Sequence, residues 1–149
     1  MVVATYNLRN ANGGDSTNGN GWGQRYPYIA QIVQFHGFDI FGTQEGKYPQ
    51  LQDLRQAMPG YDYIGVGRDD GKRAGEHSAI FYRTDKFEVL EHGDFWLSEI
   101  TDRPNKGWDA VLPRICTWGE FRDKQTGFTF LFFNLHMDHV GAVSYTHLR

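Results

Sequence analysis

The run from Phe128 to His139 constrains this chain more than any other stretch. It begins as an apolar segment and ends in polar side chains that are capable of chemistry. With the two-residue period of a strand, one face carries phenylalanines and then Asn134, His136 and Asp138. Both faces are apolar over most of the length, which predicts a strand covered on both sides. The polar end indicates a ligand-binding opening at this end of the strand, although a buried strand with a solvated end would give the same pattern.

Composition limits the classes of protein that fit. The chain has 149 residues, of which 40% are hydrophobic, and its 11 Phe, 8 Tyr and 4 Trp predict one domain with an aromatic core. A net charge of −3 provides no basic field for nucleic acid, so such a substrate would need local Arg or Lys or a bound metal. The single Cys116 excludes an internal disulfide. We find no segment of membrane-helix length and no signal peptide, and the compartment stays open.

Hydrophobic periodicity predicts helices and strands in a mixed order. Helices are expected over 24–36, with Pro27 in the first turn and Gly37 as the stop, and over 50–58. Loops are expected over 10–23 and 97–113. The expected strands are 2–9, 38–45, 61–66, 78–83, 87–96, 115–122 and 128–134. We expect 87–96 to pair with 78–83, and 115–122 with 128–134. This order predicts an α+β fold with an antiparallel or mixed sheet.

Polar side chains occur where several of these strands end. Asn7, Glu45, Asn134 and His136 lie at strand ends, and Glu76 precedes another strand. If these ends converge, a carboxylate with amide oxygens suits a hard cation such as Mg²⁺, and a nearby imidazole is typical of phosphoester cleavage. Each residue alone is more commonly structural, so the joint occurrence carries the prediction. No Cys/His spacing indicates zinc, and no Walker-type phosphate loop is present.

A series of motifs runs in one order from about residue 2 to residue 141. The motifs are Thr5-Tyr6-Asn7-Leu8-Arg9, Asp39-Ile40-Phe41-Gly42-Thr43-Gln44-Glu45, Gly75-Glu76-His77-Ser78-Ala79-Ile80-Phe81-Tyr82-Arg83, Phe95-Trp96-Leu97-Ser98, Gly107-Trp108-Asp109-Ala110, Arg114 and Asn134-Leu135-His136-Met137-Asp138-His139. In order and spacing they resemble the endonuclease/exonuclease/phosphatase superfamily. The resemblance implies the amino-terminal part of a deoxyribonuclease I-like, four-layer α/β/β/α sandwich, with the site at the strand ends.

The resemblance also implies roles for individual residues. Glu45 would be a ligand of Mg²⁺, or alternatively Mn²⁺, with Asn7 beside it. His136 would contact the scissile phosphate as general acid or charge stabiliser, and Glu76 would pair with His136 and orient it. Three further implications concern the pocket and its border. Asn134 would support the catalytic pocket, and Arg114 would hold a substrate phosphate. Asp109, with Trp108, would border the substrate site.

Other candidates receive weaker interpretations. We interpret His77 as structural or as part of the rim, Trp22 as packing, and His139 as supporting the site from the opposite strand face. Arg9 and Arg25 are left open between substrate contact and surface.

The expected function is a Mg²⁺-dependent phosphoesterase that hydrolyses a phosphomonoester or phosphodiester by in-line attack of water. Nucleic acid, a phospholipid headgroup, a sugar phosphate and an inositol phosphate all stay open as substrates, and the acidic balance mildly disfavours long nucleic acids. When full length, such a protein is expected to be a monomer. The alternatives are a non-catalytic binding protein on the same scaffold and, less favoured, a glycosidase using Glu45 and Glu76.

The end of the sequence departs from the pattern of the family. Members carry an Asp-x-Asn motif and a terminal Asp-His pair, and neither follows His139 here. We therefore expect residues 1–141 to be a partial domain and residues 142–149 to be a non-native or truncated tail. The inner apolar face of one sheet is then expected to lack its partner, which predicts an aggregation-prone, inactive chain.

Overall fold

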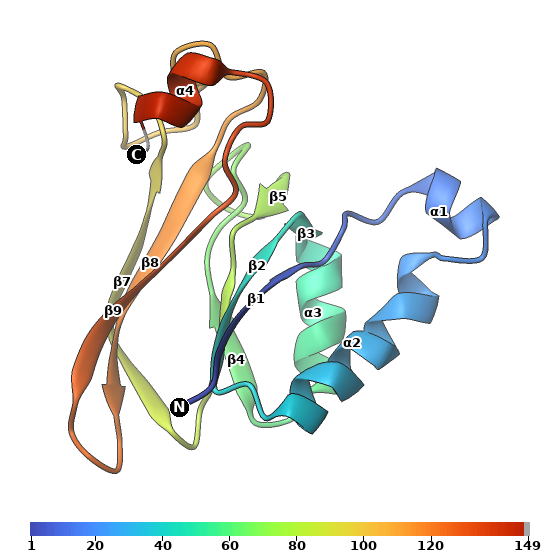
Figure 1. The fold of residues 1–149 in the computed structure, drawn as a ribbon, viewed down its shortest axis with the longest axis vertical. Helices are drawn as coiled ribbons and strands as arrows, with labels where there is room; N and C mark the ends of the chain where they lie inside the picture. Colours follow the sequence, from blue (N-terminus) through green and yellow to red (C-terminus); the bar gives the residue numbers. More distant parts are fainter. Residues whose placement is uncertain (148–149) are drawn as a thin grey trace.

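The computed structural model describes residues 1–147, and its strands form two larger sheets and one small ribbon (Figure 1). The first sheet has the order β1-β2-β6-β4, with bounds Val3–Asn7, Ile40–Gln44, Ile80–Arg83 and Tyr61–Ile64. Strands β1 and β2 are parallel, whereas β6 is antiparallel to both β2 and β4. The first sheet is therefore mixed, as the sequence predicted.

The second sheet is antiparallel and has the order β7-β8-β9. Its strands are Phe87–Trp96, Ile115–Asp123 and Thr129–Leu135. The pairing of β8 with β9 confirms the expected hairpin. Strand β7 pairs with β8, so the expected pairing of 87–96 with 78–83 is wrong. Strand β6 has β2 on one side and β4 on the other, which leaves it no free edge for β7.

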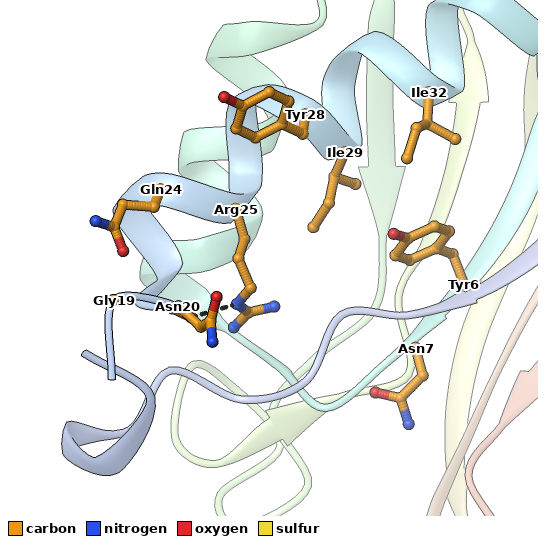
Figure 2. A pocket seen from close by; sticks show the side chains of 9 residues that line it. All are labelled: Tyr6, Asn7, Gly19, Asn20, Gln24, Arg25, Tyr28, Ile29 and Ile32. Carbon is orange, nitrogen blue, oxygen red and sulfur yellow. Dashed lines mark hydrogen bonds between the residues drawn. The ribbon is translucent and has the colours of Figure 1, made fainter. Parts of the chain in front are cut away.

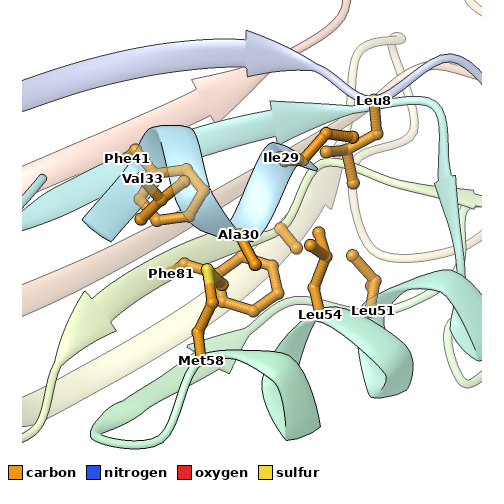
Figure 3. Packing of buried hydrophobic residues seen from close by; sticks show 10 residues of the cluster. Leu8, Ile29, Ala30, Val33, Phe41, Leu51, Leu54, Met58 and Phe81 are labelled. Atoms are coloured by element: carbon orange, nitrogen blue, oxygen red, sulfur yellow. The ribbon is translucent and has the colours of Figure 1, made fainter. Parts of the chain in front are cut away.

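Helices α2 (Trp22–His36) and α3 (Tyr48–Ala57) cover the outer face of the first sheet (Figure 1). Helix α2 ends at Gly37, whose φ of 61° is the left-handed conformation that glycine tolerates. Figure 3 shows the core beneath the helices, where Leu51, Leu54 and Met58 pack against aromatic side chains of the sheet. The apolar stripe of each helix therefore fixes it on the sheet.

Two local predictions on this side of the fold need correction. The segment 10–23 was expected to be a loop, but it contains the short helix α1 (Gly13–Thr17), whose Asp15 N–H is capped by the Asn12 side chain. Helix α2 begins at Trp22, so Pro27 lies inside the helix and not in its first turn. A single turn capped by one side chain has no hydrophobic period, which is why the pattern missed it.

The two sheets pack face to face. Ile40, Ile64 and Ile80 of the first sheet meet Phe87 and Phe121 of the second, and Phe130 and Phe132 pack against this cluster. The expectation of an unpartnered inner sheet face is therefore wrong, because this chain supplies strands to both sheets. The expectation that this strand is covered on both sides is wrong for the other face of β9, where Leu131 and Phe133 are 58% and 53% exposed.

The described layers are helix, sheet and sheet. In Figure 1 the helical layer covers only the first sheet, while α4 (Ala142–His147) lies at one end of the second. Helix α4 is anchored where Asp109 accepts hydrogen bonds from the Val143 and Ser144 N–H groups. The boundary expected at residue 141 stays a prediction, and residues 148 and 149 lie outside the described part. No helix within residues 1–147 has the length and apolarity needed to cross a membrane.

Candidate functional site

Four residues expected to carry chemistry line one cavity of about 350 Å³. Glu45 follows β2, Glu76 lies in the two-residue strand β5 (Glu76–His77), Arg114 precedes β8, and His136 follows β9. Strand β5 pairs with β3 (Gly46–Lys47), which brings Glu76 next to the segment that holds Glu45. The remaining lining residues are Asn10, Arg68, Leu112 and His139. Glu45, Glu76, Arg114 and His136 therefore meet at one cavity, which was the condition for a joint site.

Glu45 is held in an unusual backbone conformation. Its φ is 64°, a left-handed value that costs a residue with a side chain free energy and that is concentrated at functional sites. Its Oε1 accepts a hydrogen bond from Asn7 Nδ2 at 3.0 Å, and its Oε2 accepts one from the Asn10 N–H at 3.1 Å. Burial acts to raise the pKa of Glu45, but these hydrogen bonds bring the pKa below its ordinary value. Glu45 is therefore an ionised carboxylate with Asn7 beside it.

The donor set at Glu45 fits a magnesium ion that keeps most of its water ligands. Within residues 1–147, no group of three or more His, Cys, Asp or Glu side chains is gathered as a metal site. Mg²⁺ differs from zinc in needing only one or two protein carboxylates, with water completing its octahedron. An ionised Glu45 facing an open cavity, with the Asn7 amide adjacent, meets that requirement.

Glu76 is engaged by two neighbours. Its Oε2 accepts a hydrogen bond from Arg68 Nη1 at 2.8 Å, and its Oε1 accepts one from Asn10 Nδ2 at 3.2 Å. The hydrogen bonds found within residues 1–147 do not include one between Glu76 and His136. The two side chains share the cavity and interact through charge.

His136 is half-buried, and its Nδ1 has no hydrogen-bond partner among the described residues. Burial and the nearby Arg114 guanidinium lower the pKa of His136 below its ordinary 6.5, against the opposing effects of Glu45 and Glu76. At pH 7 the imidazole is therefore neutral in the free protein. In that form it can donate one hydrogen bond and accept another.

Arg114 is held rigidly beside His136. It is 4% exposed, its Nε lies 3.2 Å from Asp138 Oδ1, and its Nη2 lies 3.1 Å from His139 Nδ1. Burial would raise the pKa of Asp138, but the Gly141 and Val140 N–H groups and the guanidinium lower it to about 2. Asp138 is thus the fixed counter-ion of Arg114, a role that its place on the His136 strand face could have suggested. The expected supporting place of His139 is consistent with its contact to Arg114.

Three predicted site residues, Asn7, Asn134 and Asp109, do not line the cavity. Asn7 lines a separate cavity beside α2 and reaches the site through its hydrogen bond to Glu45. Asn134 is buried between the sheets, where its Nδ2 donates to the carbonyl oxygens of Thr43 at 2.7 Å and Ala79 at 2.9 Å. This places Asn134 behind the site as a support. The Asp109 carboxylate accepts hydrogen bonds at the start of α4 and does not line the cavity.

Sequence reasoning missed Arg68 and Asn10. Asn10 comes from the segment 10–23, which was expected to be a loop, and Arg68 comes from the segment between β4 and β5. Asn10 bridges Glu45 and Glu76 through its N–H and its side-chain amide, and Arg68 binds Glu76. Neither residue lies in a periodic segment or a motif, so only the folded loop reveals them.

A second cavity, of about 330 Å³, lies between α2 and β1 (Figure 2). Arg25 lines it and donates hydrogen bonds to the carbonyl oxygens of Leu8 at 2.7 Å, Arg9 at 3.1 Å and Asn20 at 3.0 Å. Arg25 therefore fastens α2 to the segment after β1. None of Glu45, Glu76, Arg114 and His136 lines this cavity. Elsewhere, the packing role expected for Trp22 and the buried, structural position expected for His77 agree with the structure.

The fold and the site define a two-sheet α/β sandwich with one polar cavity at its strand ends. A mannosyl-6-phosphatase of Bacteroides thetaiotaomicron VPI-5482 is 72% identical to this chain, with a TM-score of 0.95 over 97% of this chain and 54% of its own. A Bacteroides vulgatus endonuclease/exonuclease/phosphatase is 50% identical, with a TM-score of 0.91 over 94% of this chain and 53% of its own. The chain belongs to the endonuclease/exonuclease/phosphatase superfamily, and it spans about half the length of these relatives.

The curated proteins that match are more distant relatives. An uncharacterised protein of Acanthamoeba polyphaga mimivirus is 28% identical over 124 residues, which are 78% of this chain and 46% of the viral protein. No protein-family model matches the sequence. The superfamily assignment therefore rests on the solved relatives.

Proposed function

We propose that this chain carries the metal and phosphate half of a Mg²⁺-dependent phosphoester hydrolase. The observation that supports it best is the convergence of Glu45, Glu76, Arg114 and His136 on one cavity. Glu45 would hold the metal with Asn7 beside it, and the ion would polarise the phosphoryl oxygen and offset developing negative charge. The name of the 72% identical relative makes a sugar 6-phosphate the first substrate to test.

The protein side chains have separate tasks in this proposal. Arg114, fixed by Asp138, binds a phosphate oxygen and offsets charge as water attacks the phosphorus in line with the leaving oxygen. His136 donates a hydrogen bond to the phosphate while it is neutral. A phosphate dianion beside His136 raises the pKa of the imidazole, and the protonated form can then supply a proton to the leaving oxygen.

The hydrogen bonds that Glu45 and Glu76 both accept disfavour the glycosidase alternative. A glycosidase needs one carboxyl group that is still protonated, with a raised pKa, to act as the acid. The pKa of Glu45 is lowered, and Glu76 is tied to Arg68 and Asn10. A pair of carboxylates held by cationic and amide donors does not suit that chemistry.

We also propose that the 149-residue chain is inactive on its own, because it spans about half the length of the solved relatives. The test is a chimera in which residues 1–141 are joined to the remainder of the Bacteroides thetaiotaomicron mannosyl-6-phosphatase. Phosphate release from mannose 6-phosphate is measured with Mg²⁺, with EDTA, and after Mg²⁺ is restored. A Glu45→Gln chimera tests the site, and Glu91→Gln, at an exposed position, is its matched control.

The proposal expects Mg²⁺-dependent release by the chimera and by the E91Q control. It expects almost none from the E45Q chimera or from the 149-residue chain. A folded chimera that hydrolyses no phosphoester, or one indifferent to EDTA, contradicts the proposed function. An active 149-residue chain contradicts the proposal of inactivity.

A further inference from the structure

A small hollow of about 10 Å³ adjoins the large cavity and shares five of its lining residues: Glu45, Arg68, Glu76, Arg114 and His136. His77, Ser78 and Ile115 complete the lining of the hollow. This volume is close to the minimum that holds one water-sized group. The hollow can therefore accept a single oxygen atom but has no room for a carbon attached to that oxygen.

Two of the residues that line this hollow each hold a buried nitrogen without a hydrogen-bond partner. Within residues 1–147, the buried side-chain nitrogen and oxygen atoms with no hydrogen bond are Arg68 Nε and His136 Nδ1. The Asp69 carboxylate lies 3.7 Å from Arg68 Nε, which is beyond hydrogen-bond distance. Leaving a buried donor unpaired costs about 1–3 kcal/mol, and more when the group is charged. The Arg68 Nε–H is a donor, and His136 Nδ1 is a second donor in the tautomer that carries its proton there, so an acceptor oxygen would satisfy both.

The protein fixes the direction of Arg68 before any ligand arrives. Glu76 accepts a hydrogen bond from Arg68 Nη1 at 2.8 Å, and Trp96 Nε1 donates to the Arg68 carbonyl oxygen at 2.8 Å. The side chain of Arg68 is only 11% exposed. The guanidinium is thus held through Nη1, and its Nε–H has no hydrogen-bond acceptor among the described residues.

Arg114 offers a matching donor from the other side. Its Nε is used by Asp138 and its Nη2 by His139, so Nη1 takes part in none of the hydrogen bonds found within residues 1–147. Arg68 and Arg114 line both the hollow and the large cavity. Two preoriented guanidinium groups at one small space match the tetrahedral oxygens of a phosphate.

We propose that Arg68 is a substrate-binding residue that selects phosphomonoesters over phosphodiesters. The inference rests on the proposed phosphoesterase function. One terminal oxygen occupies the hollow beside Arg68, a second meets Arg114, and a third would face the magnesium ion that Glu45 would hold. A monoester has three terminal oxygens for these three places. A diester has only two, so one place would receive an oxygen carrying a carbon substituent.

The test is direct binding to the ¹⁵N-labelled 149-residue chain. The Nε–Hε signal of Arg68 is followed by NMR while phenyl phosphate, a monoester, or methyl phenyl phosphate, a diester, is added with Mg²⁺ present. Arg68→Lys retains a cation beside Glu76 but has no Nε–H, and Arg68→Gln removes the charge. Arg55→Gln, whose arginine pairs with Asp62 on the surface, is the matched control. The melting temperature of each variant reports whether it is folded.

The expected result is a saturable shift of the Arg68 Nε–Hε signal with the monoester. Both Arg68 variants should lose about tenfold or more in monoester affinity, as expected for one charge-assisted hydrogen bond, and lose little diester affinity. R55Q should bind like the wild type. Equal losses for both esters, or no loss in a folded R68K protein, overturn the selectivity and leave the proposed function standing. A wild-type chain that binds neither ester overturns the proposed function and this inference with it.

Discussion

The Asn134 side-chain amide donates hydrogen bonds to the main-chain oxygens of both Thr43 and Ala79, at 2.7 and 2.9 Å. Its Oδ1 accepts a third hydrogen bond, from Gln44 Nε2 at 2.9 Å. One side chain of β9 is therefore satisfied entirely by the facing sheet. A Cβ atom at Gly42 would lie 2.4 Å from Asn134 Oδ1, so glycine is what allows this approach. The contact sets the position of β9, and thereby of His136, over the end of β2.

Replacing Asn134 with Asp tests this linkage. Aspartate has nearly the same shape, but it cannot donate to the two buried carbonyl oxygens and would place a charge against them. We expect a loss of about 2–4 kcal/mol in the free energy of unfolding, measured by urea denaturation. The exposed loop substitution Gln125→Glu is the matched control and should change stability by less than about 0.5 kcal/mol. Equal stability of N134D and Q125E would show that the amide contact is unimportant.

Much of the fold could be predicted from the sequence because apolar period and turn residues are local signals. The bounds of β7 matched the expected segment, and the convergence of Glu45 and His136 followed from strand ends that carry polar groups. The predicted partner of β7 was wrong because strand pairing depends on which strand edges are free in the folded sheet. Arg68 was missed because its role comes from a folded loop. Asp109 was misplaced because a motif position does not show which N–H groups a carboxylate meets.

Metal binding by Glu45 can be measured on the chain itself. We expect Mn²⁺, used as a paramagnetic substitute for Mg²⁺, to bind the wild-type chain, with loss of free-ion signal in electron paramagnetic resonance. Glu45→Gln should weaken binding about tenfold or more, because the amide lacks the negative charge that a hard cation requires. Glu91→Gln supplies the control at an exposed position. Wild-type affinity in the E45Q variant would remove Glu45 from the metal site.

The protonation of His136 should respond to phosphate. Burial and Arg114 lower its pKa, so an NMR titration of the ring protons should give a midpoint below 6.5 in phosphate-free buffer. Adding phenyl phosphate should move the midpoint upward, because a dianion in the cavity favours the imidazolium. A His136 midpoint that phosphate leaves unchanged would separate this residue from the phosphate site.

The lowered pKa of Asp138 predicts that the free energy of unfolding falls in acid. Its pKa of about 2 in the folded chain lies below the ordinary 3.8, so the ionised carboxylate stabilises the fold above about pH 4. That contribution, on the order of 2 kcal/mol, is lost as the pH falls from about 4 towards 2. The difference in unfolding free energy between wild type and Asp138→Asn should therefore shrink over that range. The control is Asp102→Asn, at an exposed position, whose unfolding free energy should stay close to that of the wild type at every pH. A difference between D138N and the wild type that is independent of pH would refute the linkage.

The central claim is that Arg68, Arg114 and His136 surround a phosphate-binding place. The most direct measurement is the anomalous X-ray signal of tungstate, a heavy analogue of phosphate, soaked into crystals of the 149-residue chain. We predict one strong peak within hydrogen-bond distance of Arg68 and Arg114, and its loss in the Arg114→Gln variant. A tungstate peak found only in the cavity beside Arg25 would contradict the claim. So would the absence of any peak in a crystal in which Arg68 is ordered and its Nε binds only a water molecule.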